Sequence, residues 1–322
     1  MKEIVIDVLG SDKGASELVL GCIQARIEHP DYKITIVGVK DEIVKVLTDN
    51  NEDISLYNVI DSKPLPSEIH DVMSMLRYKE HCSVIDALEY AKANDDVAGV
   101  ISAGPTGMVL VSSIRHLGLL DGVDFPALGV LLYNIKQQYV SIVDCGANIE
   151  IKEEKLFQFA KLGTALMRSY CGIESPRVGL MNVGTEDTKG DSLRKAAFPL
   201  FKNSSLNFVG NIEGNDVFMD KVDVVACDGF TGNIILKNAE AVAMIARHIA
   251  LKNDEKKTAD DLYNMFAYNE LGGAIVIGSK KPIIKAHGAA NRKTIASVVS
   301  DIVKLDQNNF IENMKKEIAA EK

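Results

Sequence analysis

Residues 177–201, RVGLMNVGTEDTKGDSLRKAAFPLF, contain the pattern that decides the fold. The stretch begins with a short apolar run, RVGLM. It then passes through a turn rich in Gly, Thr and acidic residues and continues into an amphipathic run, SLRKAAFPLF. The apolar run predicts a buried strand and the amphipathic run predicts a helix. A strand that leads through a polar turn into a helix is the unit from which parallel α/β sheets are built.

The same unit recurs along the chain. Apolar runs predict strands at 3–10, 32–39, 57–62, 97–104, 177–184, 207–212, 223–229, 274–279 and 282–288. Amphipathic runs predict helices at 15–29, 41–50, 67–78, 83–95, 107–118, 156–172, 192–201, 232–251 and from about 292 onward. Two apolar runs, 126–134 and 138–148, are separated by a polar turn, which predicts an antiparallel hairpin.

These elements predict an α/β protein with a largely parallel sheet, helices on both faces and two lobes around a cleft. We expect residues 1–322 to form a single α/β domain, since no linker or repeat marks a boundary between the lobes.

Composition argues against several classes of protein. A net charge of −9 disfavours a general nucleic-acid or anionic-membrane surface. No apolar run approaches the length needed to cross a bilayer, and the N-terminus lacks the pattern of a secretory signal. The five cysteines show no paired spacing, which indicates reduced thiols. We therefore expect a cytoplasmic protein that binds no nucleic acid.

Five predicted strands end in turns that combine Gly with small polar residues. These turns are 101–108, 144–150, 182–191, 227–234 and 285–292. Ligands of open α/β sheets bind beside the carboxyl ends of strands, where free amides favour an anion. The standard nucleotide loops, the GxSxG elbow, the HExxH motif and Cys/His clusters are missing from the sequence. The pattern predicts an anion held by amides, Asn, Thr and Lys, with neither cofactor nor metal.

Six ordered motifs resemble those of the PlsX family of phosphate acyltransferases: SAGPTG (102–107), DCGAN (144–148), NVGTEDTKGD (182–191), FVGNIEGNDV (208–217), VVACDGFTGNIILK (224–237) and KPIIKAHG (281–288). The resemblance covers nearly the whole chain. It implies an α/β/α fold similar to phosphotransacetylase and isopropylmalate dehydrogenase. It also implies transfer of a fatty acyl group from acyl carrier protein to inorganic phosphate in phospholipid synthesis, by a homodimer.

Such a reaction needs donors that hold a phosphate dianion and stabilise the developing oxyanion, and no covalent nucleophile. With the resemblance, Lys189, Asn233 and His287 are the predicted catalytic residues. Lys189 neutralises phosphate, whereas without the resemblance a salt bridge to Glu186 or Asp187 is the simpler interpretation. Asn233 is an amide donor or a turn former, and His287 contacts phosphate, the thioester or only its own turn.

The other candidates bind phosphate or substrate. Thr185 and Thr188 donate hydroxyl bonds or cap the next helix, and Asn148 is an amide donor or a turn former. Asp228 is expected to orient Lys189 or Asn233. The remaining candidates lie in the same kinds of turn: Asp12, Gly104, Thr106, Gly107, Gly184, Gly229 and Gly232.

Three features depart from the family pattern. Ser11 and Lys13 replace a glycine and a histidine in the first turn, and Pro105 removes one N–H from the predicted anion cradle. The stretch 248–274 is shorter and less apolar and basic than the helical hairpin through which family members contact membranes. We therefore expect this stretch to bind membranes weakly at most.

Alternatives remain open. The altered loops also fit a phosphate acyltransferase that uses a short-chain acyl-CoA or a protein-bound acetyl thioester, and they fit a non-catalytic member of the fold. A decarboxylating NAD-dependent dehydrogenase would need an acidic metal cluster and a nucleotide loop, neither of which is evident in the sequence.

Two expectations concern partners. Basic residues in two places, Arg77 with Lys79 and the group Lys280, Lys281, Lys285, Arg292 and Lys293, are expected either to dock the acidic carrier protein or only to pair with nearby acids. The apolar hairpin 126–144 is expected to contribute a buried edge to a homodimer.

Overall fold

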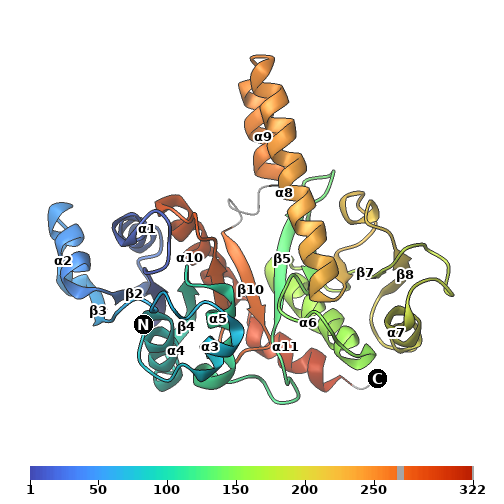
Figure 1. Ribbon diagram of the computed structural model, residues 1–322, viewed down its shortest axis with the longest axis horizontal. Coiled ribbons are helices and arrows are strands. Elements are labelled where there is room, and N and C mark those ends of the chain that lie inside the picture. Colours follow the sequence, from blue (N-terminus) through green and yellow to red (C-terminus); the bar gives the residue numbers. More distant parts are fainter. Residues whose placement is uncertain (267–271, 321–322) are drawn as a thin grey trace. The chain divides into compact units, whose positions relative to one another are not determined.

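The computed structural model describes residues 1–266 and 272–320, and strands and helices alternate along it (Figure 1). The chain forms two compact units, each assembled from separate segments. Unit 1 contains Met1–Pro126 and Leu271–Gln307, and unit 2 contains Ala127–Glu270 and Asn308–Lys322. In both units the sheet is parallel except for one antiparallel strand pair. The prediction of an α/β fold with a largely parallel sheet is confirmed.

The strands of unit 1 lie in the order β3-β2-β1-β4-β11-β10. Their bounds are β1 (Lys2–Asp7), β2 (Tyr32–Gly38), β3 (Tyr57–Asp61), β4 (Val97–Ser102), β10 (Gly273–Ile277) and β11 (Ile283–Ala286). Strand β4 pairs in parallel with β1 and with β11, whereas β10 is antiparallel to β11. The carboxyl ends of β1, β4 and β11 therefore meet at one edge of the sheet.

The helices of unit 1 bury apolar side chains against the sheet or against one another. They are α1 (Ala15–Glu28), α2 (Lys40–Asp49), α3 (Val72–Arg77), α4 (Ser83–Ala93), α5 (Thr106–Ser112) and α10 (Arg292–Gln307). Helices α1 and α10 touch at Gly21, where a Cβ would lie only 2.6 Å from the Cβ of Ile295. Helix α4 packs on β1 and β4.

The strands of unit 2 lie in the order β5-β6-β9-β7-β8. Their bounds are β5 (Ala127–Tyr133), β6 (Tyr139–Val143), β7 (Val178–Met181), β8 (Phe208–Ile212) and β9 (Val224–Ala226). Strands β5 and β6 form the antiparallel hairpin that the sequence predicts. Strand β9 is parallel to both β6 and β7, so the carboxyl ends of these three strands also meet at one edge.

The helices of unit 2 are α6 (Glu153–Cys171), α7 (Ser192–Lys202), α8 (Gly229–Lys252), α9 (Lys256–Phe266) and α11 (Phe310–Ala319). Helix α6 packs against β6 and β9, and Gly163 lets it approach Val224 closely. Helix α11 lies on α6, where Glu317 pairs with Arg168. Helices α8 and α9 lie side by side (Figure 1).

Three predicted helices have different bounds in the structure. The helix predicted at 107–118 is α5 followed by a π-helix at Ser113–Leu117. The predicted C-terminal helix is two helices, α10 and α11, because Asn309 between them adopts the left-handed conformation at φ 53°. The helix predicted at 67–78 is restricted to α3, which starts after Asp71. The Asp71 carboxylate caps the backbone N–H groups of Met73 and Ser74.

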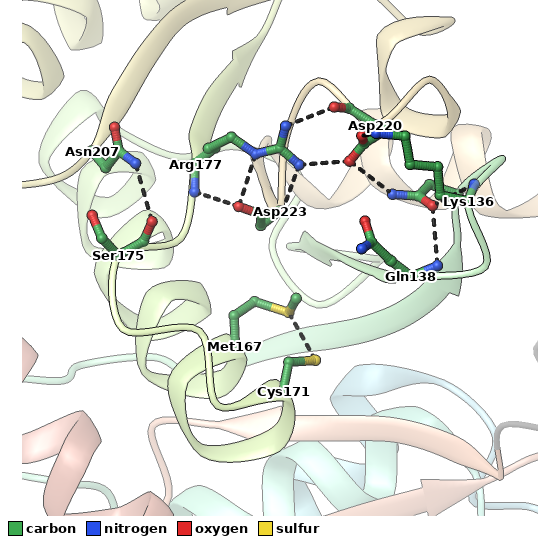
Figure 2. A network of polar contacts seen from close by, with 10 residues as sticks. Lys136, Gln138, Met167, Cys171, Ser175, Arg177, Asn207, Asp220 and Asp223 are labelled. Carbon is green, nitrogen blue, oxygen red and sulfur yellow. Dashed lines mark hydrogen bonds and ion pairs between the residues drawn. The ribbon is translucent and has the colours of Figure 1, made fainter.

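The amino ends of β7 and β9 are joined by a polar network around Arg177 (Figure 2). The Arg177 guanidinium donates to both carboxylate oxygens of Asp223 and to Asp220, at distances between 2.8 and 3.1 Å. Asp220 also pairs with Lys136 in the β5–β6 turn. This network lies at the end of the unit 2 strands opposite to the predicted site turns.

Candidate functional site

The predicted site residues fall into two groups, one at the carboxyl edge of each sheet. The group in unit 2 follows β6, β7 and β9 and contains Asn148, Gly184, Thr185, Thr188, Lys189, Asp228, Gly229, Gly232 and Asn233. The group in unit 1 follows β1, β4 and β11 and contains Asp12, Gly104, Thr106, Gly107 and His287.

The turn after β6 is organised by Asp144, which the sequence analysis does not single out. This fully buried carboxylate accepts hydrogen bonds from the backbone N–H groups of Leu128, Ala147 and Asn148, at 2.9, 3.2 and 2.7 Å. The side-chain amide of Asn148 donates to the same carboxylate at 2.9 Å. Burial raises the pKa of Asp144 above its usual value, against these hydrogen bonds. The side-chain hydrogen bond of Asn148 holds it to the turn in which it lies.

The first turn of α8 lies directly against the turn after β6. The backbone N–H of Gly229 donates to the Asn148 carbonyl at 2.7 Å. A Cβ on Gly232 would overlap the carbonyl oxygen of Asp144, so this position admits only glycine. The Asn233 side-chain amide has no hydrogen-bond partner within the part of the chain that the structure describes. It lies near Gly146, whose Cβ would be 3.7 Å from the Asn233 Oδ1.

Lys189 lies in the exposed turn after β7. Its ammonium is 3.9 Å from the Glu186 carboxylate, at the limit of an ion pair, and its side chain is 51% exposed. The carbonyl of Lys189 accepts from the side-chain amide of Asn182 at 3.1 Å, which fixes the backbone of the turn. Thr185 and Thr188 are exposed in the same turn. The ammonium is therefore held loosely and can turn toward a ligand.

Asp228 differs from its expected role. It is the N-cap of α8 and accepts from the backbone N–H and the hydroxyl of Thr231, at 2.9 and 2.8 Å. Its other partner is the guanidinium of Arg194, not Lys189 or Asn233. Burial raises the pKa of Asp228, but the hydrogen bonds from Thr231 and Arg194 outweigh burial and keep the pKa below its usual value.

Sequence reasoning missed Arg194, which lies in α7 one turn after the N-cap Asp191. The sequence contained only a weak signal. Arg194 follows soon after a turn at the end of a strand, but the other residues of its helix give no reason to expect a buried cation. Its partner Asp228 is 34 residues further along the chain. The contact arises because β7 and β9 are neighbours in the sheet.

In unit 1, the loops that follow β1 and β11 contact each other. The backbone N–H of Asp12 donates to the Gly288 carbonyl at 2.7 Å, and the Ser11 hydroxyl donates to the Ala290 carbonyl at 2.9 Å. The Nδ1 atom of His287 accepts from the N–H of Ala289 at 3.1 Å. Asp12 and His287, which the sequence places in separate motifs, thus lie in adjoining loops.

A second buried acid, Asp7, lies at the base of these loops and was also missed. Its carboxylate accepts from the Ser102 hydroxyl at 2.6 Å and from the N–H of Leu9 at 3.0 Å. Burial raises the pKa of Asp7 to about 6. The Ser102 hydroxyl oxygen in turn accepts the N–H of Gly104 at 3.1 Å, so that Asp7 supports the turn after β4.

Helix α5 begins after that turn. Pro105 is its N-cap rather than its first residue, and Thr106 opens the helix. Gly107 lies under Met75, since a Cβ there would be 2.9 Å from the sulfur. The turn after β4 therefore still leads into a helix, although Pro105 has no backbone N–H.

Among the described residues, one group has atoms close enough to ligate a metal ion: His81, Asp86 and Glu89, with ligand atoms within 4.8 Å of one another. The Nδ1 atom of His81 lies 2.7 Å from Asp86, and Glu89 lies 2.8 Å from the Nδ1 atom of His116. These two pairs satisfy the side chains without an ion.

Comparison with known proteins gives a consistent assignment. A family model described as "Fatty acid synthesis protein" matches residues 2–313. The chain is 34% identical over 328 residues to the phosphate acyltransferase of Clostridium tetani (strain Massachusetts / E88), covering 98% of each chain. It is 36% identical over 309 residues to that of Bacillus cereus (strain B4264), covering 92% of each. A phosphotransacetylase from Streptococcus pyogenes shares the fold, with a TM-score of 0.65 and 16% identity over 96% of this chain and 94% of that one.

Proposed function

The chain belongs to the fatty acid synthesis protein family, the PlsX family of phosphate acyltransferases, and from that premise we propose that it transfers a fatty acyl group from acyl carrier protein to inorganic phosphate. It is an acyltransferase. The products are acyl phosphate, for phospholipid synthesis, and free carrier protein.

The observation that carries the proposal is the group of donors at the carboxyl edge of unit 2. The half-exposed ammonium of Lys189 lies in the turn after β7, and Asn233 lies near the start of α8, which follows the neighbouring strand β9. The N-terminus of a long helix such as α8 favours an anion. These features suit a phosphate dianion.

The reaction then proceeds by direct attack. A phosphate oxygen forms a bond to the thioester carbonyl carbon, and the carbon–sulfur bond breaks. The Lys189 ammonium neutralises the bound phosphate. It then stabilises the negative charge that develops on the carbonyl oxygen. The leaving group is the thiolate of the carrier protein. A thiol has a pKa of about 8.5, so this thiolate leaves without a strong general acid.

The carrier protein is expected to dock on Arg77 and Lys79, which are both exposed. The other basic group is less suitable. The Lys281 ammonium donates to the carbonyls of Asn94 and Val97, at 2.7 and 3.0 Å, and Arg292 pairs with Glu17. For Lys281 and Arg292 we therefore favour the alternative expectation, that the cation only pairs with nearby groups of the same protein.

The homodimer is expected to form through α8. Val242, Met244, Ile245 and Ile249 are between 54% and 61% exposed. Three of them, Val242, Ile245 and Ile249, share one helix face by their spacing. The hairpin expected to supply the edge does not leave β6 free, because β6 pairs with both β5 and β9.

A second copy fits the α8 face better than a membrane does. Residues 247–261 mix acidic and basic side chains, whereas peripheral lipid binding needs apolar area together with net positive charge. No described helix has the length and hydropathy to cross a bilayer. Part of the stretch expected to give little membrane contact, 267–271, lies outside the described residues.

The proposal is tested by incubating the purified protein with acyl carrier protein thioesters, with and without phosphate. Hydroxylamine trapping measures acyl phosphate, and a thiol reagent measures released carrier. We expect both products in equal amounts, and only with phosphate. Short-chain acyl-CoA and a protein-bound acetyl thioester are run in parallel. If either of these is turned over faster in the presence of phosphate, that thioester is the substrate instead of the carrier-bound one. If no thioester gives acyl phosphate, the proposed reaction is wrong.

A further inference from the structure

Arg194 connects three structural elements at the unit 2 site, and its side chain is only 11% exposed. Its Nε atom lies 3.3 Å from the carbonyl oxygen of Met181 at the end of β7. One terminal nitrogen is 2.9 Å from Asp191, the N-cap of α7. The other contacts Asp228, the N-cap of α8, and lies 3.0 Å from the Thr231 hydroxyl. A single guanidinium therefore links the starts of two helices.

The charge on Asp228 poses a problem for an anion site. The carboxylate is 5% exposed and lies at the start of the helix that favours phosphate. Its hydrogen bonds favour the ionised form, so it carries a negative charge at neutral pH. An unpaired carboxylate there would repel a phosphate dianion in a partly buried site, where charges are weakly screened.

We propose that Arg194 is a positioning residue for phosphate, which cancels the charge of Asp228 and fixes the first turns of α7 and α8 beside each other. This inference rests on the proposed function, because it places phosphate at the unit 2 turns. Arg194 acts through Asp228 and the two helix starts and does not itself touch the reacting atoms. A planar guanidinium suits this role because its donors reach several acceptors at once.

The decisive experiment removes each charge separately and then both together. Phosphate affinity is measured by calorimetry with inorganic phosphate alone and as KM in the acyltransfer assay. Arg194→Gln exposes the Asp228 charge, and we expect phosphate affinity to fall by about tenfold or more, with the KM of the thioester changed less than about twofold. Asp228→Asn keeps an N-cap and leaves the positive charge of Arg194 uncompensated, so it should bind phosphate several-fold more tightly than the wild type.

The double variant Arg194→Gln/Asp228→Asn separates charge cancellation from general damage. We expect it to regain most of the phosphate affinity that Arg194→Gln loses, since neither charge remains. Arg177→Gln is the matched control: this arginine is also held by two aspartates, but at the amino ends of the strands (Figure 2). Its substitution should lower stability and leave phosphate affinity unchanged.

The inference is overturned by unchanged phosphate affinity in Arg194→Gln, by no recovery in the double variant, or by an equal loss in Arg177→Gln. If Arg194→Gln does not fold, the Asp228→Asn comparison still decides, because unchanged or weaker phosphate binding there contradicts charge cancellation. Calorimetry needs no acyl donor. An Arg194-dependent phosphate site in a protein that transfers no acyl group would keep this inference and reject the proposed reaction.

Discussion

Lys189 combines a fixed backbone with a loosely held charge. Its carbonyl is bound by Asn182, while its ammonium is 3.9 Å from Glu186 and half exposed. An exposed pair of this kind contributes little to stability. The side chain can therefore be removed without loss of the fold, and its effect on the reaction can be measured cleanly.

We expect Lys189→Ala to lower turnover by about a hundredfold or more, which corresponds to about 3 kcal/mol of lost transition-state stabilisation. The thermal midpoint of unfolding should stay within about two degrees of the wild type. Steady-state assays with saturating phosphate and thioester give the comparison, and Lys195→Ala, on the exposed side of α7, is the control. A folded Lys189→Ala enzyme with near-normal turnover would exclude Lys189 from catalysis.

Asp7 gives a pH dependence of stability. Its pKa is about 6 in the folded protein against 3.8 as the ordinary value, because burial disfavours the charged form. Between these values the folded state binds more protons than the unfolded state. The Asp7 contribution therefore lowers the free energy of unfolding as pH rises from about 4 to about 6, by roughly 2–3 kcal/mol in all.

Asp7→Asn should remove this part of the pH dependence, because the amide can accept from Leu9 and donate to Ser102 without ionising. Urea unfolding at pH 4.5 and pH 7 measures the difference between the two proteins. The variant should lose less stability than the wild type between these pH values. If the free energy of unfolding changes equally with pH in the two proteins, the pKa of Asp7 is not raised by folding.

At the residue scale, a sequence groups candidate side chains correctly in space only where one turn contains all of them. Lys189, Thr185 and Thr188 are neighbours in the chain and lie in one exposed turn. Arg194 and Asp7 were missed because their side-chain partners Asp228 and Ser102 are distant in the chain. Arg194 meets Asp228 only through strand adjacency, and Asp7 meets Ser102 across two paired strands. Hydrophobic pattern does not encode such contacts.

At the scale of elements, the alternation of apolar and amphipathic runs was sufficient to predict most strands and helices. The periodicity reports burial, and burial decides these elements. The prediction of one long C-terminal helix was wrong because a single left-handed residue, Asn309, interrupts a pattern that is amphipathic on both sides. The helix predicted at 67–78 was too long because Asp71 caps α3 late.

The exposed apolar face of α8 leads to a prediction about assembly. We expect the wild type to be a dimer by light scattering at micromolar concentration, and Ile245→Glu to be a monomer. Burial of a large aliphatic side chain contributes about 1.5–3 kcal/mol, and a dimer buries two copies of each residue.

Ile27→Glu is the control for that experiment, because Ile27 is 62% exposed on α1, close to the 61% of Ile245. It should remain dimeric. A wild-type monomer, or dissociation by both variants alike, would contradict an interface on α8.

At the scale of the whole molecule, a net charge of −9 disfavours the approach of an acidic carrier protein. Local cations must outweigh this field at short range, and their effect must weaken with salt, since exposed charges are screened within about 8 Å at physiological ionic strength. The double variant Arg77→Glu/Lys79→Glu should raise the KM of carrier-bound substrate severalfold at low salt and leave that of phosphate unchanged.

The matched control is Lys33→Glu/Lys40→Glu, which changes the net charge by the same amount at two other exposed positions of unit 1. It should affect the carrier KM far less. Equal effects of the two double variants would show that net charge, rather than a docking patch, governs the encounter.

The division into two units was not predictable as a boundary. The chain changes unit at 126–127, 270–271 and 307–308, and no proline-rich or glycine-rich linker marks these places. Linker composition reveals a boundary only where the connecting chain is solvated. The units are recognised by their internal packing, which the sequence does not display.

The interleaving of the two units has a consequence for synthesis on the ribosome. Unit 1 receives β11, β10 and α10 only after nearly all of unit 2 has been translated, and unit 2 receives α11 last of all. Nascent domains generally fold as they emerge, but here neither unit is complete until translation has reached Gln307. A message truncated before residue 292 would therefore yield two incomplete units rather than one functional half, and such a product would be a ready substrate for proteolysis.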